Sequence, residues 1–194
     1  MGNNLVCRKH VDLGFLLDGS GSVEMYGKGN FQRCLNFIKA IANAFAISPK
    51  DTRVGTILFS DDSELIFGFD RYSNRNSLAE ALDKITLPGK TTFTGKGLKM
   101  AHTNLFANAR AEVPHILIVL TDGRSHDDVV KPSKELKQAG VKIFTVGLGT
   151  NYDESQLKAI ANEPYDTHAL TVDFPQMTTT VNKLRNLICK GRFG

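Results

Sequence analysis

The chain has 194 residues, a formal net charge of +4 and ordinary proportions of apolar and charged residues. This length is enough to bury the core of one soluble domain, which we expect to span residues 5–190. The charge is too small, and the basic residues too separate from aromatic ones, to indicate nucleic-acid binding. No apolar run approaches transmembrane length, so membrane insertion is not expected.

Segments typical of strands and helices alternate along the chain. Apolar runs bounded by polar turns predict strands at residues 11–17, 53–59, 64–69, 115–120, 141–148 and 167–172. Apolar residues at helical spacing predict helices at residues 31–45, 73–85, 96–106, 127–138, 153–161 and 174–189. The pattern predicts an α/β fold, a doubly wound and mostly parallel six-stranded sheet with helices on both faces. Residues 64–69 form its one short antiparallel edge strand.

The first predicted strand ends in Asp18-Gly19-Ser20-Gly21-Ser22. Carboxylate and hydroxyl oxygens at alternate positions suit a hard cation such as Mg²⁺ or Mn²⁺ better than zinc, and the glycines let the backbone curl around it. A Gly/Ser-rich turn without a ligand is the alternative. Two similar polar segments, residues 92–95 and 121–123, are expected at the same edge of the sheet, where α/β proteins bind ligands.

The chain has three cysteines, Cys7, Cys34 and Cys189. Cys7 precedes the first predicted strand and Cys189 ends the last predicted helix. The residues alone leave two interpretations open, which are three free thiols or one disulfide that joins the chain ends.

Taken together, the segments D-x-S-x-S, T-x-T-G and T-D-G resemble, in this order, the von Willebrand factor A domain family. The resemblance covers about residues 6–189 and is strongest with the extracellular-matrix branch, such as matrilins and the non-triple-helical parts of collagens. It implies an extracellular location, in a secreted protein or the ectodomain of a larger one. It also implies a binding role rather than an enzymatic one.

The resemblance further implies a metal-ion-dependent adhesion site for Mg²⁺ or Mn²⁺. Ser20 and Ser22 would bind the ion through their hydroxyls, Asp18 and Asp122 mainly through waters, and Thr92 directly when a ligand is bound. A carboxylate from the partner would complete the coordination. The residues expected to contact that partner are Arg124, Thr94 and Glu24.

The expected partner is an extracellular-matrix protein, collagenous or other, that offers an acidic residue. Residues 122–142 leave no room for the additional helix of collagen-binding integrin domains, which argues against collagen binding in the integrin manner. One alternative is a structural matrix module with an unused metal site. Another is a metal-dependent phosphate-handling enzyme, which is disfavoured because the phosphate-binding motif G-x-x-x-x-G-K-[ST] and the dinucleotide fingerprint are both absent.

The resemblance also favours a disulfide between Cys7 and Cys189, with Cys34 as a reduced and largely buried thiol. Such a tether on the last helix implies one working conformation of the site. Basic residues are expected to gather at the chain ends, opposite the metal site: Arg8, Lys9, Lys183, Arg185, Lys190 and Arg192. They form either an ordinary solvated face or a weak site for a polyanion such as a sulfated glycosaminoglycan.

Overall fold

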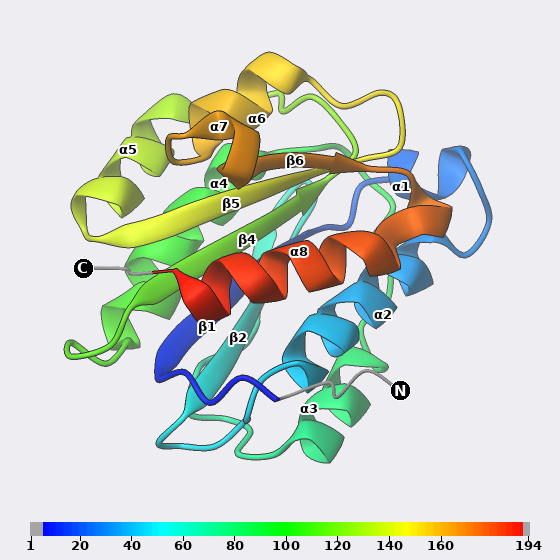
Figure 1. Ribbon diagram of the computed structural model, residues 1–194. Helices are drawn as coiled ribbons and strands as arrows, with labels where there is room; N and C mark the ends of the chain where they lie inside the picture. Colours follow the sequence, from blue (N-terminus) through cyan, green and yellow to red (C-terminus); the bar gives the residue numbers. More distant parts are fainter. Residues whose placement is uncertain (1–5, 192–194) are drawn as a thin grey trace.

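The computed structural model describes residues 6–191 and is built around a six-stranded sheet in the order β3-β2-β1-β4-β5-β6 (Figure 1). The strands are β1 (Val11–Asp18), β2 (Thr52–Phe59), β3 (Ser63–Phe67), β4 (His115–Thr121), β5 (Val141–Leu148) and β6 (Ala169–Val172). Only β2 and β3 pair in antiparallel fashion; the other neighbours are parallel. The predicted fold class is confirmed, including the antiparallel edge strand.

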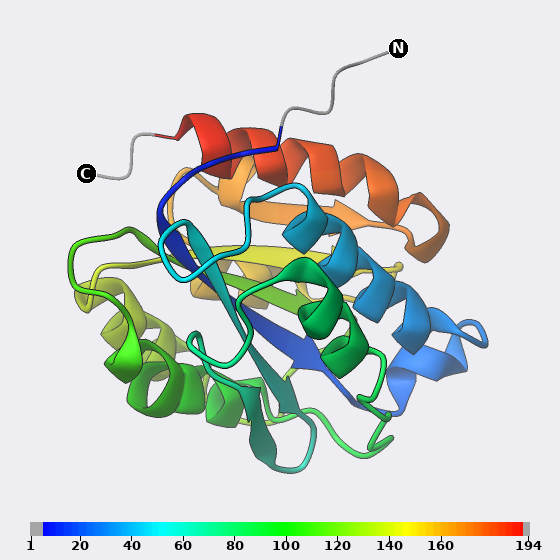
Figure 2. The same ribbon diagram turned by 90° about the horizontal axis from the view of Figure 1, so that it is seen from below.

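Helices cover both faces of the sheet (Figures 1 and 2). The α-helices are α1 (Ser22–Met25), α2 (Asn30–Asn43), α3 (Arg75–Leu82), α4 (Thr94–Met100), α5 (Val130–Gln138), α6 (Glu154–Ile160), α7 (Tyr165–His168) and α8 (Met177–Lys190). Three further helical segments are η1 (Ala101–Leu105), η2 (Phe106–Asn108) and η3 (Phe174–Gln176). One face carries α2, α3 and α8; the other carries α4, α5, α6 and η1.

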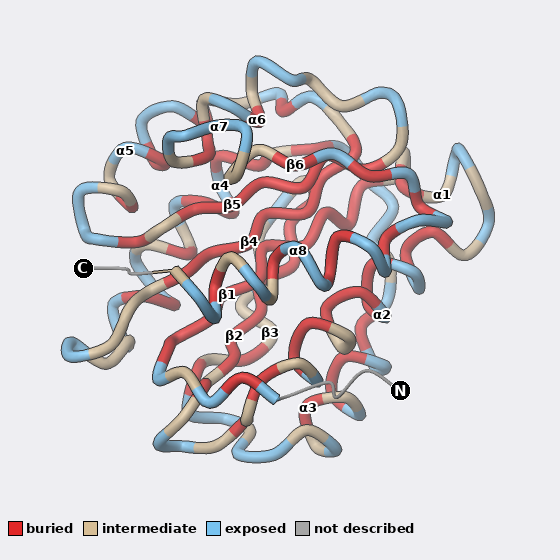
Figure 3. Tube along the Cα trace, in the orientation of Figure 1, coloured by how far each residue is buried: buried red, intermediate tan, exposed pale blue. Residues whose placement is uncertain are grey.

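Strand β1 is buried along its whole length, and β4 is buried at every position after His115 (Figure 3). Side chains alternate between the two faces, so that Phe15 and Leu17 of β1 pack under α2 and α8, whereas Leu16 packs toward α4. Gly55 of β2 lets η1 come close, because a Cβ there would lie 2.4 Å from a methyl carbon of Leu105. The sheet therefore has a packed core on each side, with its functional loops left at the strand ends.

The start of α5 differs from the sequence prediction. The predicted helix at residues 127–138 begins only at Val130. Asp127 instead accepts hydrogen bonds from the backbone N–H groups of Gly95 and Lys96, each at 2.8 Å, and so satisfies the first turn of α4. The acidic residue belongs to the neighbouring helix rather than to its own. The short helices α1 and α7 were also not predicted.

The two chain ends are joined at the amino edge of the sheet. Cys7 and Cys189 form a disulfide with Cα atoms 6.0 Å apart, as predicted. The Lys9 ammonium also donates to the Gly191 carbonyl. Cys34 is a free thiol, fully buried in α2, and burial raises its pKa above the ordinary range.

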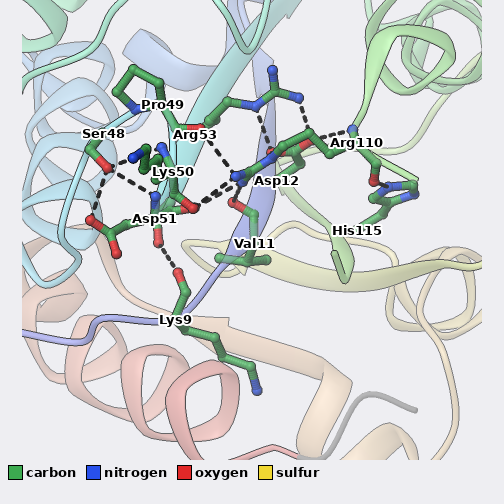
Figure 4. A network of polar contacts seen from close by, with 11 residues as sticks. Lys9, Val11, Asp12, Ser48, Pro49, Lys50, Asp51, Arg53, Arg110 and His115 are labelled. Carbon is green, nitrogen blue, oxygen red and sulfur yellow. Dashed lines mark hydrogen bonds and ion pairs between the residues drawn. The ribbon is translucent and has the colours of Figure 1, made fainter. Parts of the chain in front are cut away.

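A buried ionic cluster closes the same edge (Figure 4). Asp12 is fully buried at the start of β1, and its carboxylate accepts hydrogen bonds from Arg53 at 2.6 and 2.9 Å and from the Arg110 side chain at 2.8 and 3.0 Å. Arg110 also donates to the carbonyls of Pro49, Lys50 and Asp51. The cluster fixes the loops at the end of the sheet opposite the candidate site.

Candidate metal centre

The loop after β1 is held in place by backbone hydrogen bonds at the carboxyl edge of the sheet. The Gly19 N–H donates to the Phe59 carbonyl at 2.8 Å, and the Gly21 N–H donates to the Lys90 carbonyl at 2.8 Å. In return, the Gly89 N–H donates to the Gly19 carbonyl at 2.9 Å. The loop is therefore fixed between the end of β2 and the segment that leads to Thr92.

Asp18 is fully buried and joins this loop to the end of β4. Its Oδ1 accepts the Ser20 N–H at 2.8 Å, and its Oδ2 accepts the Thr121 hydroxyl at 2.7 Å. Burial raises the pKa of Asp18, although the hydrogen bonds from Ser20 and Thr121 act in the opposite direction. Both carboxylate oxygens already have protein partners, which suits an indirect role toward an ion.

A short chain of oxygen atoms runs from Ser20 to Asp122. The hydroxyls of Ser20 and Ser22 are 2.9 Å apart, and Ser22 donates to Asp122 Oδ1 at 2.9 Å. Asp122 is 1% exposed, and its Oδ2 has no hydrogen-bond partner within residues 6–191. Burial and the nearby Asp18 carboxylate raise the pKa of Asp122 to about 6. Two buried carboxylates side by side favour a cation between or beside them.

Thr92 faces the same place. A Cβ added to Gly123 would lie 3.8 Å from both the Ser22 hydroxyl and the Thr92 hydroxyl, so the two oxygens flank one point beside Asp122. Thr92 is buried, and its carbonyl accepts the His126 N–H at 2.9 Å. The structure thus brings together all five predicted ligand residues, which come from three separate segments: Asp18, Ser20, Ser22, Thr92 and Asp122.

We call these five residues the metal cradle. Their side-chain oxygens suit a hard cation. The described part of the chain has no cluster of three or more histidine, cysteine, aspartate or glutamate side chains that could hold a metal. An ion here would depend on serine and threonine hydroxyls, two nearby carboxylates and water. This ligand set fits Mg²⁺ or Mn²⁺, and the unpartnered Asp122 Oδ2 provides an acceptor that nothing else in the described chain uses.

Two residues that were not predicted, Ser125 and Gln156, support the cradle through hydrogen bonds. The Ser125 hydroxyl accepts the Thr94 N–H at 3.0 Å and donates to Asp127 at 2.5 Å. The Ser125 N–H in turn donates to the Gln156 side chain at 2.9 Å. These contacts join the start of α4 to α6, and no motif in the sequence signals them.

One of the three predicted partner contacts needs correction. Thr94 is 2% exposed, so its side chain is not open to a partner. Glu24 is half-buried and accepts the backbone N–H groups of Gly29 at 2.7 Å and Phe31 at 2.8 Å, so its carboxylate also organises the α1–α2 connection. Arg124 remains on the surface, with 78% of its side chain exposed, and forms an ion pair with Asp153 at 3.5 Å.

The predicted basic face lies at the other end of the molecule. Arg8, Lys183 and Lys190 are exposed, and Arg185 is half-buried with a hydrogen bond to Asn186. Lys9 is half-buried and bonds to Gly191. Arg192 lies outside the described residues.

No helix within residues 6–191 is long and apolar enough to cross a membrane.

Comparison with known proteins supports the relationship indicated by the motifs. The family model for the von Willebrand factor type A domain matches residues 12–183. The chain is 39% identical over 168 residues to human von Willebrand factor A domain-containing protein 2, covering 86% of the chain and 22% of that protein. It is 33% identical over 184 residues to human vitrin, covering 94% of the chain and 26% of vitrin. The chain thus spans about a quarter or less of these relatives.

Solved structures show the same fold. Proximal thread matrix protein 1 from the mussel byssus superposes with a TM-score of 0.88 at 30% identity, covering 94% of this chain and 47% of that one. A second structure of the mussel protein has a TM-score of 0.87 at 30% identity, covering 94% of this chain and 46% of that one. In that structure zinc occupies the metal-ion-dependent adhesion site (MIDAS) motif. The chain therefore belongs to the von Willebrand factor type A domain family, in its extracellular-matrix branch.

Proposed function

We propose that this domain is an extracellular adhesion module that binds a matrix protein through a divalent cation, Mg²⁺ or Mn²⁺. The cradle of Ser20, Ser22, Thr92, Asp18 and Asp122 holds the ion. The observation that carries the proposal is the buried Asp122 Oδ2, which has no partner among the described residues, whereas Oδ1 of the same carboxylate accepts the Ser22 hydroxyl. A bound cation is the positively charged partner that this carboxylate lacks among the described residues.

The ligand chemistry explains how such an ion would recognise a partner. Neutral hydroxyls take part of its coordination, and each oxygen of Asp18 already accepts one hydrogen bond, from Ser20 or from Thr121. The ion therefore keeps much of its charge, and Mg²⁺ retains water molecules that an incoming carboxylate can replace. A partner aspartate or glutamate completes the site. Arg124, which is exposed near this edge, is one of the predicted contacts for the partner.

The relatives indicate the class of partner. They include vitrin and the collagen alpha-1(XXI) chain of Xenopus laevis, which is 37% identical over 162 residues, covering 84% of this chain and 17% of that protein. A matrix protein, collagenous or not, that offers an acidic residue fits this setting. Between β4 and β5 the structure has only α5, so we do not propose collagen recognition in the integrin manner.

Two other functions compete with this proposal. A structural matrix module with the same fold would leave the cradle unused, and Mg²⁺ would then not bind. A phosphate-handling enzyme would need a nucleophile or general base at the ion. Asp18, the acid at the end of β1, is fully buried and each of its oxygens already accepts a hydrogen bond, which argues against that role.

Calorimetric titration with Mg²⁺, Mn²⁺ and Zn²⁺ tests the proposal. Ser22→Ala removes a hydroxyl ligand, and Ser73→Ala, at an exposed position, is the matched control. Ser22→Ala is preferable to Asp18→Ala, because loss of the buried Asp18 carboxylate would also leave Ser20 and Thr121 without their acceptor. We expect wild type and Ser73→Ala to bind the cation, and Ser22→Ala to bind it at least tenfold more weakly.

A matrix-extract pull-down provides the second part of the test. Wild-type protein should retain its partner in Mg²⁺ and release it in EDTA, and Ser22→Ala should retain much less. If none of the three cations binds, the structural-module alternative is correct. If the cation binds but EDTA does not release the partner, the partner binds another surface.

A further inference from the structure

A hollow of about 440 Å³ lies at the same edge of the sheet as the metal cradle. We call it the loop hollow. Its walls are the α1–α2 connection, with Tyr26, Lys28 and Arg33, and the segments that follow β5 and β6, with Asp173 and Phe174. Figure 1 shows the α1–α2 connection beside the start of the α8 segment, at the carboxyl ends of β5 and β6.

The α1–α2 connection is rigid and close to the cradle. It follows Ser22 directly, since that residue begins α1. The Glu24 carboxylate accepts both the Gly29 and the Phe31 N–H groups, and Arg33 donates to the Lys28 carbonyl at 3.3 Å. Gly29 has a left-handed φ of 85°, which completes the turn. The connection is thus organised before any partner arrives, which lowers the entropy cost of binding.

The wall of the loop hollow combines apolar surface with hydrogen-bond donors. Tyr26 is 58% exposed and offers an aromatic ring to an occupant of the loop hollow. Lys28 and Arg33 add two exposed cations. Asn30, in the floor, is 2% exposed, and its Nδ2 has no acceptor among the residues that the structure describes. Donors and positive charge therefore outnumber acceptors along this wall.

One carboxylate opposes this charge. Asp173 lies on the other side of the loop hollow and is exposed. It reduces the attraction for an anion without cancelling it, because two cations face it. An occupant with a methylene stem and a terminal carboxylate, such as a glutamate side chain, matches the apolar and the cationic parts of the wall together.

We propose that the loop hollow is a second contact site for the same protein partner, which takes a second acidic side chain of that partner while the first one completes the metal site. This inference rests on the proposed function. The stem of the side chain packs on Tyr26, and its carboxylate lies toward Lys28 and Arg33. The partner is thus recognised as an extended segment with two acidic residues at a fixed spacing.

The test uses random linear peptides displayed on phage, selected on the wild-type domain in Mg²⁺ and eluted with EDTA. We expect the eluted peptides to share two acidic residues at one spacing. Affinity of a selected synthetic peptide is then measured for Lys28→Gln, for Asp173→Asn and for Lys131→Gln, an exposed lysine on α5 that serves as the charge-matched control. Mg²⁺ affinity, measured without peptide, should be the same in all variants.

The two variants of the loop hollow should change affinity in opposite directions. Lys28→Gln removes an attractive charge and should weaken peptide binding by about two- to fivefold, the range of exposed charge pairs. Asp173→Asn removes a repulsive charge and should strengthen it by a similar factor. Lys131→Gln should leave affinity unchanged, and added salt should reduce the effect of Lys28→Gln.

Three outcomes would overturn the inference. Eluted peptides with a single acidic residue would remove the need for a second site and leave the proposed function intact. Equal peptide affinity for wild type, Lys28→Gln and Asp173→Asn would place the second acid elsewhere on the surface, with the same consequence. A selection that gives no EDTA-eluted peptide would count against the proposed function as well.

Discussion

Ser22 donates a hydrogen bond to Asp122 Oδ1 over 2.9 Å, although 100 positions of sequence separate the two residues. The contact joins the loop after β1 to the end of β4, two neighbouring parallel strands. It satisfies one oxygen of a buried carboxylate and leaves the other without a partner in the described chain. The free energy of unfolding of the metal-free protein should therefore depend on whether Asp122 carries a proton.

The first prediction concerns pH. The pKa of Asp122 is raised to about 6 in the folded protein, whereas an unfolded aspartate titrates near pH 4. Between these values the folded state holds a proton that the unfolded state has lost. The metal-free protein should thus gain stability as pH falls from 7 to 4, by about 2 kcal/mol from this group alone. Mg²⁺ competes with that proton, so its stabilising effect should shrink below about pH 6.

Thermal unfolding with and without Mg²⁺ at several pH values measures this effect. The His168 pKa is lowered by burial, so His168 opposes the trend in the same pH range. It lies on α7 and contributes equally with and without the ion, so the difference between the two curves isolates the site. Asp122→Asn should reduce the pH dependence of that difference, and the part that remains belongs to Asp18, whose pKa burial also raises. A Mg²⁺ effect that is constant from pH 5 to 8 would contradict the prediction.

The second prediction concerns the ionic cluster at the amino edge (Figure 4). Asp12→Ala would leave Arg53 and Arg110 next to each other without their shared anion. Removal of one partner from a buried pair costs about 3–5 kcal/mol. We expect a loss of this size in the free energy of unfolding, measured with urea. Arg110 would keep its carbonyl acceptors, so the loss should fall toward the lower value.

An exposed ion pair provides the control for this measurement. Glu154 and Lys158 are one turn apart on α6 and pair at 2.6 Å. Glu154→Ala should cost no more than about 0.5 kcal/mol, since water screens both groups. Equal losses for Asp12→Ala and Glu154→Ala would mean that the buried cluster contributes nothing special to stability.

The strands, and the grouping of the candidate ligand residues at one edge of the sheet, could be predicted from local patterns and from the family resemblance. The run that ends at Asp18 is apolar at nearly every position, and this predicts a central parallel strand without knowledge of its neighbours. Asp18, Ser20 and Ser22 lie within one loop, so their convergence required only that the loop curl. The position of Asp122 followed from the general rule that ligands bind at the carboxyl edge of such sheets.

Contacts between distant segments could not be predicted in this way. Asp127 resembles a first-turn residue of its own helix, yet it accepts the N–H groups of Gly95 and Lys96 instead. Glu24 resembles an exposed acid near the site, yet the α1–α2 connection uses both of its oxygens. In each case a backbone donor with no other acceptor decides where the carboxylate goes, and only the folded chain shows that donor.

The third prediction concerns the basic face at the chain ends. Lys183 and Lys190 are exposed and lie two turns apart on α8, near the end that is joined to Cys7. If this face binds sulfated glycosaminoglycan, Lys183→Ala/Lys190→Ala should elute from immobilised heparin at lower salt than wild type. Lys131→Ala/Lys134→Ala on α5 removes the same charge elsewhere and is the control. Elution of the two double variants at the same salt concentration would show that the face is an ordinary solvated surface.

The last prediction concerns the disulfide that joins Cys7 to Cys189. It closes a loop with a sequence separation of 182, and in the chain-entropy model so long a loop stabilises the fold by about 5 kcal/mol. Cys7→Ser/Cys189→Ser should lower the free energy of unfolding by an amount of this order, measured with urea at neutral pH. Cys34→Ser, at the buried free thiol, is a separate variant that keeps the disulfide intact.

The same double variant should leave the metal site unchanged. Other contacts keep α8 in place, because Leu184 and Ile188 are fully buried in the core and Cys7 itself is held by hydrogen bonds with Ala44 and Ala46 at 2.8 Å. The disulfide then adds stability to a position that α8 already holds, and the site keeps one working conformation. We expect the Mg²⁺ affinities of wild type and Cys7→Ser/Cys189→Ser to agree within about twofold, the spread that context alone produces. A large change in Mg²⁺ or partner affinity in a variant that is still folded would show instead that the tether sets the conformation of the site.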